Sequence, residues 1–304
     1  MKILLDKDQY SPIIALSNRL PNDTNWLDAQ TRPVIAVSDV SFANADVVVT
    51  TEKEAHKIAA NISKYPGTAL ILAQVLRATE CVSVETGIMM ESLAYSTLQS
   101  GLEHQNWLTK RKKHCPFTYC CEANEEAIIL RRKGSQLFAT LNRPARRNAI
   151  SVEMRDAFQE MCDLVLYDET IHTLNINAAG ACFSVGGDLQ EFGLLSNPAE
   201  GHLIRSLRHP GRAMAGIANK TRFFLHSACI GSGIEIAAFA EHVVARRNSF
   251  FQLPELSLGL IPGAGGCISV ARRIGRQRTA WMVYSGRKIT ATKALEWGLV
   301  DELN

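Results

Sequence analysis

The spacing of apolar residues changes twice along the chain and divides it into three parts. In residues 1–50, short apolar runs at 12–16, 33–37 and 46–50 are separated by polar stretches, which predicts short strands around a short helix. No residue in this α/β extension points to chemistry. We therefore expect it to have a structural or contact role.

Residues 51–120 follow a helical period instead. Its first segment has apolar residues at the i, i+3, i+4 and i+7 positions of an amphipathic helix: Ala55, Ile58, Ala59 and Ile62. Further helices are predicted over 69–80, 82–101 and 103–113. The basic run that ends the last helix suits the dipole at a helix C-terminus, so we interpret it as a solvated end rather than a phosphate site. This block should bury its apolar faces against the rest of the chain or another subunit.

From residue 121 to 304 strand-like and helix-like segments alternate, which indicates an α/β architecture built on a sheet. A hairpin is predicted over 127–144, turning at Lys133 and Gly134. Ser151 can cap the helix that follows it. A long helical segment is expected over about 198–219.

Composition excludes several function classes. The chain is 46% hydrophobic and 21% charged, and its net charge of +3 gives no reason to expect nucleic acid or a membrane surface as a partner. No apolar run is long enough to span a bilayer, and Asp6, Lys7 and Asp8 interrupt any signal-peptide core. Eight cysteines lying mostly in apolar runs suggest reduced thiols and a cytoplasmic protein. The cluster Cys115, Cys120 and Cys121 lacks zinc-ligand spacing, so we expect no metal.

Two glutamates stand in apolar surroundings near glycine-rich turns. Glu235 follows the turn GSGIE, and Glu255 lies in LPELSLGLIPGAGG. A carboxylate in apolar surroundings is unfavourable unless it is paired or used in a reaction. The structural alternative is that Glu235 pairs with Arg246 or Arg247 and that Glu255 is a solvated loop residue.

Four motifs in order, LNRPARRNAIS, FSVGGDL, GSGIE and LPELSLGLIPGAGG, closely resemble the enoyl-CoA hydratase/isomerase (crotonase) family. The resemblance runs from about Ala127 to Leu303. It implies a crotonase-like spiral of ββα units, here joined to a helical block. Such proteins bind acyl-CoA thioesters and are usually trimers or dimers of trimers, so a homo-oligomer is expected.

The resemblance stops at the chain's last residues, where family members usually continue into several helices. The segments over 52–113 resemble that C-terminal run, including its basic end. We therefore expect a permuted order in which the family's terminal helices precede the core. An unrelated helical domain is the alternative.

The resemblance also implies roles for individual residues. The amides of Gly187 and Ser232 would form an oxyanion hole, with Ser232 standing where the family often has glycine. Glu255 would be the main acid/base and Glu235 would orient and activate water. Contacts to CoA map to six residues: Asn148, Ala149, Gly187, Asp188, Leu189 and Gln190.

Two further features are interpreted conservatively. Arg146 and Arg147 could meet phosphates but are read as solvated side chains. His226 and Ser227 replace the usual small residue and glycine of the family. Because adjacent strand residues face opposite sides, they indicate packing and a changed acyl pocket rather than a nucleophilic pair.

The function predicted from these residues is hydration of a trans-2-enoyl-CoA, without a metal or redox cofactor and with CoA as part of the substrate. Having both glutamates favours a hydratase. One alternative is an isomerase or another enolate reaction on the same fold. The other is a non-catalytic acyl-CoA-binding or assembly subunit that uses the N-terminal helices as an interface.

Overall fold

The structure, a computed structural model, describes residues 11–114, 126–195 and 197–304. The cysteine cluster at 115, 120 and 121 and the interrupted apolar start at residues 6–8 lie outside this part of the chain. No helix in the part described is long and apolar enough to cross a membrane.

A six-stranded sheet forms the base of the core, in the order β12-β9-β7-β6-β5-β4. Neighbouring strands are parallel except β4 and β5, which form the predicted hairpin with Lys133 paired to Gln136. Side chains of β5 alternate between core and exterior, as expected for a strand with one buried face. The strands are β4 (Ile128–Lys133), β5 (Gln136–Leu141), β6 (Thr173–Ala178), β7 (Thr221–Leu225), β9 (His242–Ala245) and β12 (Glu302–Leu303).

A second, three-stranded sheet has the order β11-β10-β8. Its strands are β8 (Ala228–Ile230), β10 (Phe250–Gln252) and β11 (Ile289–Thr290). The chain passes repeatedly between the two sheets and the helices that cover them: α6 (Val152–Tyr167), α7 (Pro198–Leu207), α8 (Pro210–Gly216), α9 (Ser232–Ala237), α10 (Gly266–Ile274), α11 (Arg276–Ser285) and α12 (Ala291–Trp297). Short 3-10 turns η3 (Pro144–Arg146), η4 (Leu189–Glu191), η5 (Ala218–Lys220) and η6 (Glu255–Leu258) connect them. This layered α/β arrangement confirms the predicted fold class.

The helical segment expected over 198–219 is broken into α7 and α8. Pro210 opens α8, and the residue before a proline is disfavoured in the helical region, so His209 is extended and caps the new helix. Its Nδ1 accepts from the amide of Arg212 at 3.1 Å. The prediction of one helix was wrong for this reason.

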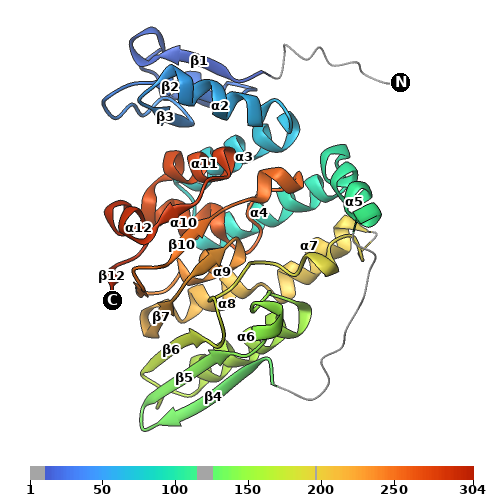
Figure 1. Ribbon diagram of the computed structural model, residues 1–304, viewed down its shortest axis with the longest axis vertical. Helices are drawn as coiled ribbons and strands as arrows, with labels where there is room; N and C mark the ends of the chain where they lie inside the picture. Colours follow the sequence, from blue (N-terminus) through green and yellow to red (C-terminus); the bar gives the residue numbers. More distant parts are fainter. Residues whose placement is uncertain (1–10, 115–125, 196) are drawn as a thin grey trace.

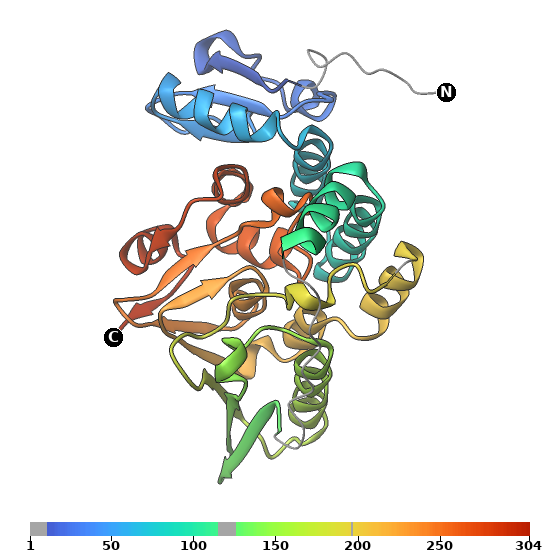
Figure 2. The ribbon, with the colours of Figure 1, turned by 45° about the vertical axis from the view of Figure 1, so that its right-hand side comes forward.

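The N-terminal helices pack on the core. They are α2 (Glu52–Ile62), α3 (Pro66–Thr79), α4 (Val84–Gln99) and α5 (Leu102–His114). α4 lies against α7 and α10, α3 lies against α10 and α11, and α5 reaches η6 (Figures 1 and 2). The apolar faces of α2, α3 and α4 are thus buried against the rest of the chain.

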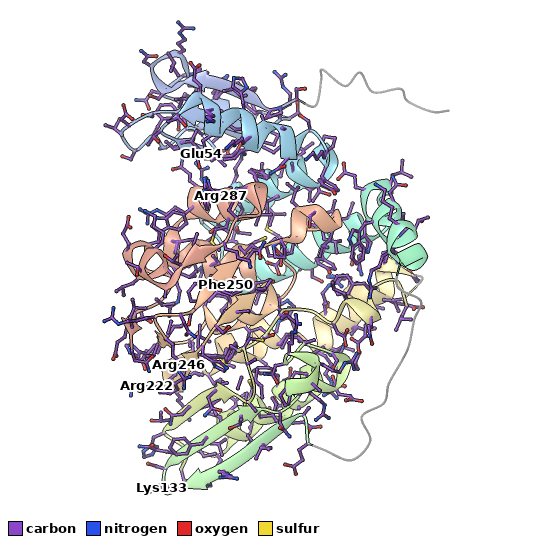
Figure 3. All side chains as sticks on the ribbon, viewed as in Figure 1. Glu54, Lys133, Arg222, Arg246, Phe250 and Arg287 are labelled. Carbon is purple, nitrogen blue, oxygen red and sulfur yellow. The ribbon has the colours of Figure 1, made fainter. Side chains whose placement is uncertain are left out.

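Residues 11–50 form a small parallel sheet at one end of the molecule, opposite the β4–β5 hairpin (Figure 1). It contains β1 (Ile13–Leu16), η2 (Ser17–Arg19), α1 (Thr24–Asp28), β2 (Val34–Val37) and β3 (Val47–Val49). Asp46 joins it to α3 through a buried ion pair with Arg77 at 2.6 Å. Helix α2 bridges to the far end of the chain, where Glu54 approaches Arg287 at 3.3 Å (Figure 3).

Candidate active site

Two glycine-rich segments meet beside β8, at the edge of the three-stranded sheet. The chain before Gly187 pairs with the strand before Ser232 through a bridge between Ser184 and Cys229. At Gly186, with φ of 90°, a Cβ atom would lie 2.8 Å from the carbonyl oxygen of Ile230. Only glycine permits this approach, which brings the two predicted oxyanion-hole segments side by side.

The amides of Gly187 and Ser232 are available as donors. Neither N–H donates to a backbone carbonyl anywhere in the residues that the structure describes, whereas the next amide, that of Asp188, bonds to Ile150 at 3.1 Å. Ser232 is the first residue of α9, so its N–H is one of the groups that a helix start leaves unpaired. Gly231, with φ of 51°, turns the chain into that helix.

Glu235 is buried on α9 and is held by backbone. Its Oε2 accepts from the amides of Ala264 at 2.8 Å and Gly266 at 3.0 Å. Its side chain forms no ion pair with an arginine in the described residues, so the alternative of a pair with Arg246 or Arg247 is wrong. Burial raises the pKa of Glu235 to about 7, against the lowering effect of these amides.

Glu255 follows Pro254 at the start of η6 and is only 8% exposed, so it is not a solvated loop residue. Its Oε1 lies 2.7 Å from the position that a Cβ at Gly231 would take, and Oε1 of Glu235 lies 3.8 Å from the same position. The two carboxyl groups therefore converge on the Gly231 turn. Oε2 of Glu255 is buried without a hydrogen-bond partner in the described part of the chain. Burial, and then the charge of Glu235, raises the pKa of Glu255 well above its ordinary value.

A third glutamate, which the sequence analysis did not select, lies behind this pair. Glu91 of α4 is fully buried and accepts from the amides of Gly265 at 2.7 Å and Cys267 at 2.8 Å. Burial and the neighbouring Glu235 raise its pKa to about 8. The signal in the sequence was its position on the helix, because it lies three residues after Ile88 on the face that α4 buries.

Two more side chains that the sequence analysis did not select border the site. The ring of Tyr95, one turn after Glu91 on α4, lies close against Gly263. The guanidinium of Arg205 from α7 stacks on that ring at 4.7 Å. Burial raises the pKa of Tyr95, and burial lowers the pKa of Arg205.

The residues predicted to contact CoA lie in one neighbourhood, but several are occupied by internal contacts. Asn148 and Ala149 are buried, and the Asn148 side chain bonds the backbone of Arg143, Ala179 and Cys182. Its amide therefore holds a loop, and its predicted role towards CoA stays a prediction.

The next predicted contact segment is joined to the helical block. Asp188 and Gln190 both bind the guanidinium of Arg146, at 2.5 and 2.8 Å. The partly exposed Leu189 accepts a hydrogen bond at its carbonyl from Arg111 of α5. Phe192 packs beside Gly187 and against two rings of α5, His104 and Trp107.

His226 and Ser227 do not form a nucleophilic pair. The Nε2 atom of His226 lies 3.1 Å from the carbonyl oxygen of Gly180. Ser227 has φ of 53°, a left-handed conformation that glycine would adopt without strain. In the segments that the structure describes, no group of three or more His, Cys, Asp or Glu is placed to hold a metal ion.

The fold is thus a layered α/β core in which two convergent carboxyl groups lie beside two unpaired amides. The family described as "Enoyl-CoA hydratase/isomerase" matches residues 132–304, more than half of the chain. The chain belongs to this family.

Curated relatives carry hydratase and isomerase names. The chain is 33% identical over 180 residues to a 2,3-dehydroadipyl-CoA hydratase of Escherichia coli, covering 58% of this chain and 68% of the relative. It is 32% identical over 163 residues to a probable mitochondrial enoyl-CoA hydratase 2 of Arabidopsis thaliana, covering 53% and 54%. An enoyl-CoA isomerase/hydratase of Mycosarcoma maydis is 33% identical over 172 residues, covering 54% and 63%. The chain thus spans between about half and two thirds of the length of these relatives.

Solved structures agree on the fold of the core. An enoyl-CoA hydratase of Mycobacterium smegmatis aligns with a TM-score of 0.54 and 25% identity, over 59% of this chain and 70% of that one. One from Thermoplasma volcanium aligns with a TM-score of 0.53 and 26% identity, over 60% and 74%.

Proposed function

We propose that this protein is an enoyl-CoA hydratase that adds water across the double bond of a trans-2-enoyl-CoA. The observation that carries the proposal is the convergence of Glu235 and Glu255 on the Gly231 turn, next to the amides of Gly187 and Ser232. The names of the curated relatives support the same reaction class.

The thioester carbonyl oxygen would accept from the amides of Gly187 and Ser232. One carboxylate takes a proton from water while the water oxygen bonds to Cβ, and the carbonyl becomes an enolate. The other carboxyl group then gives its proton to Cα. The oxyanion donors stabilise the enolate, and one such donor is worth about 3 to 4 kcal/mol of barrier.

The chemistry needs one protonated and one ionised carboxyl group at the same time. Burial raises the pKa of Glu235 to about 7, and burial followed by the charge of Glu235 raises the pKa of Glu255 well above its ordinary value. A close pair of this kind loses its two protons in separate steps. Following the resemblance, we assign the proton for Cα to Glu255 and the activation of water to Glu235. No redox or metal chemistry enters these steps.

We also propose that the helical block takes the place of the family's C-terminal helices. Its support is the contact of α4 and α5 with the site, through Tyr95 against Gly263 and Arg111 on the carbonyl of Leu189. CoA would bind along Asn148, Ala149 and the segment 187–190.

Assembly as a homo-oligomer is part of the proposal. Helices α4 and α7 pack together and expose large apolar side chains: Met89, Leu93, Leu203 and Leu207. An exposed apolar surface of this kind is typical of an interface. Light scattering of the wild type and of Leu207→Glu would test it, with a smaller mass expected for the variant.

The function is tested by supplying enoyl-CoAs of different chain length and measuring their hydration as the loss of the enone absorbance. Glu255→Gln and Glu235→Gln should each lower kcat by at least about a hundredfold while CoA still binds. Glu241→Gln, which changes an exposed glutamate just after α9, is the matched control and should retain full activity. Normal hydration in the double variant Glu235→Gln/Glu255→Gln would reject the assignment.

The same assay separates the alternatives. An isomerase would convert a 3-enoyl-CoA to the conjugated isomer faster than it hydrates the 2-enoyl-CoA. A non-catalytic acyl-CoA-binding subunit would bind the thioester but convert neither the 2-enoyl-CoA nor the 3-enoyl-CoA. The presence of two convergent carboxyl groups favours hydration over both.

A further inference from the structure

Ser232 carries a buried hydroxyl that no group of the described chain satisfies. The residue is only 9% exposed, and its Oγ makes no hydrogen bond in the residues that the structure describes. A buried hydroxyl without a partner costs free energy, and an alanine would fill nearly the same space without that cost. The hydroxyl is therefore suited to an acceptor that the chain itself does not supply.

The amide of the same residue is unpaired as well. Among the described residues the N–H of Ser232 donates to no backbone carbonyl, whereas the amides around it are taken. The amide of Gly231 donates to Gln252 at 2.9 Å. The amides of Ile234 and Glu235 donate to the carbonyl of Gly231, at 2.9 and 3.0 Å. Two donors of one residue are thus left over at the start of α9.

These two donors can reach one and the same oxygen. Ser232 is the first residue of α9, and in a helical residue the N–H points to the same side of the chain as Cβ. In a gauche rotamer the serine Oγ and the amide nitrogen are about 3 Å apart. An acceptor held by the amide therefore lies about 3 Å from Oγ as well, which is hydrogen-bond distance. Rotation about the Cα–Cβ bond is enough to bring the hydroxyl to it.

The surroundings of the turn select the kind of acceptor. The segment of Gly187, whose amide is also unpaired, touches the turn at Gly231, because a Cβ on Gly186 would lie 3.6 Å from the Gly231 Cα. The carboxyl groups of Glu235 and Glu255 border the same turn, and their charge would repel an anionic ligand such as a phosphate. A neutral carbonyl oxygen, which gains negative charge only during a reaction, suits these donors better.

We propose that the Ser232 hydroxyl is a third donor of the oxyanion hole, and that it binds the thioester carbonyl oxygen together with the amides of Gly187 and Ser232. This inference rests on the proposed function, which places a thioester carbonyl at that point. The hydroxyl donates a hydrogen bond and forms no bond to carbon. Because the bond strengthens as the carbonyl becomes an enolate, the hydroxyl acts on kcat more than on KM.

The direct test observes the bound carbonyl without any turnover. Butyryl-CoA, which has no double bond to hydrate, is labelled with 13C at the thioester carbonyl, and infrared difference spectra give its C=O stretching frequency. Binding to the wild type should lower this frequency relative to the free thioester. In Ser232→Ala, which keeps the amide and loses the hydroxyl, at least about a quarter of that shift should disappear, since one of three donors is lost.

Ser249→Ala is the matched control. It removes another buried serine hydroxyl, which donates to the carbonyl of Leu225 within the chain, and it should leave the carbonyl frequency of bound butyryl-CoA unchanged. The melting temperature without ligand should fall in Ser249→Ala and should not fall in Ser232→Ala. A lower melting temperature of Ser232→Ala would show that its hydroxyl has a structural partner, and would overturn the inference.

Activity separates this inference from the proposed function. If enoyl-CoA is hydrated, kcat should fall about tenfold to a hundredfold in Ser232→Ala while KM changes little. If the wild type hydrates no enoyl-CoA but Ser232→Ala still moves the carbonyl frequency, the proposed function fails and the third donor stands. If hydration is present and the frequency is the same in the wild type and in Ser232→Ala, the function stands and the inference is overturned.

Discussion

Gly231 faces Glu255 so closely that a single methyl group on the glycine would lie 2.7 Å from the carboxylate Oε1. Real Cβ atoms do not come this near to an oxygen, so the carboxyl group can keep its place only while residue 231 has no side chain. The same residue has φ of 51°, and it carries the chain into α9 and the Ser232 amide. One glycine thus sets both the position of a carboxyl group and the start of α9, whose first amide is the proposed oxyanion donor.

Gly231→Ala should therefore abolish activity. The methyl group displaces the Glu255 carboxylate and strains the turn, so kcat for hydration should fall by at least about a hundredfold, the range expected for a lost acid/base. Gly134→Ala is the matched control, because Gly134 has a similar φ of 59° with nothing within 4 Å. It should lower stability alone, and full activity of Gly231→Ala would contradict the assigned geometry.

The raised pKa of Glu235 predicts a pH-dependent effect of Glu235→Gln on stability. Between the ordinary glutamate pKa of about 4.3 and about 7, the folded protein keeps a proton that the unfolded chain releases. Stability is therefore lost as pH rises through this window. The glutamine can accept both amides and has no charge to bury, so above pH 7 the variant should be more stable by up to roughly 3 kcal/mol.

Urea unfolding at pH 4.5 and pH 8 measures this difference. The wild type and Glu235→Gln should have similar free energies of unfolding at pH 4.5, and the variant should be the more stable of the two at pH 8. A gap of equal size at both values would mean that Glu235 titrates normally in the folded protein.

Ser227→Gly should stabilise the fold. Ser227 adopts φ of 53°, where a side chain is strained and glycine is not. Its carbonyl accepts from Phe250 at 2.9 Å, a bond that glycine keeps. We expect a gain of about 1 kcal/mol, read as a higher melting temperature. Ser227→Ala retains the strain and should show no gain.

Asp46→Asn should weaken the attachment of the N-terminal sheet. Asp46 accepts from Arg77 and from the amide of Val34, and both charged side chains are almost fully buried. Removing one charge leaves the other buried and unpaired, which destabilises by about 3 to 5 kcal/mol. Denaturant unfolding measures the loss in the free energy of unfolding. Faster hydrogen exchange in residues 34–49 would show that the loss is local to the N-terminal sheet.

Glu296→Gln is the control for the ion pair at Asp46. Glu296 pairs with Lys293 on an exposed face of α12, where solvent screens the charges, so its loss should change stability by less than about 1 kcal/mol. Equal effects of the two substitutions would show that the Asp46 pair does not hold the sheet in place.

Local sequence patterns predicted secondary structure correctly where the residues that interact are close to each other in the sequence. The hairpin turning at Lys133 and Gly134 and the cap at Ser151 depend on neighbours a few positions away, and both are confirmed. The break at Pro210 was missed, although a proline restrains the residue before it, because apolar spacing alone was followed over 198–219.

By itself the sequence determined the family and the identity of the two convergent glutamates, because the four motifs carry the residue types and order that the site requires. Only the tertiary structure decided how they are held. Glu91 binds the amide of Gly265 from 174 positions earlier in the chain. Such a contact follows from how α4 packs on α10, and helical spacing shows only that Glu91 is on a buried face. It is this packing that makes a residue of the N-terminal helices part of the Gly231 site.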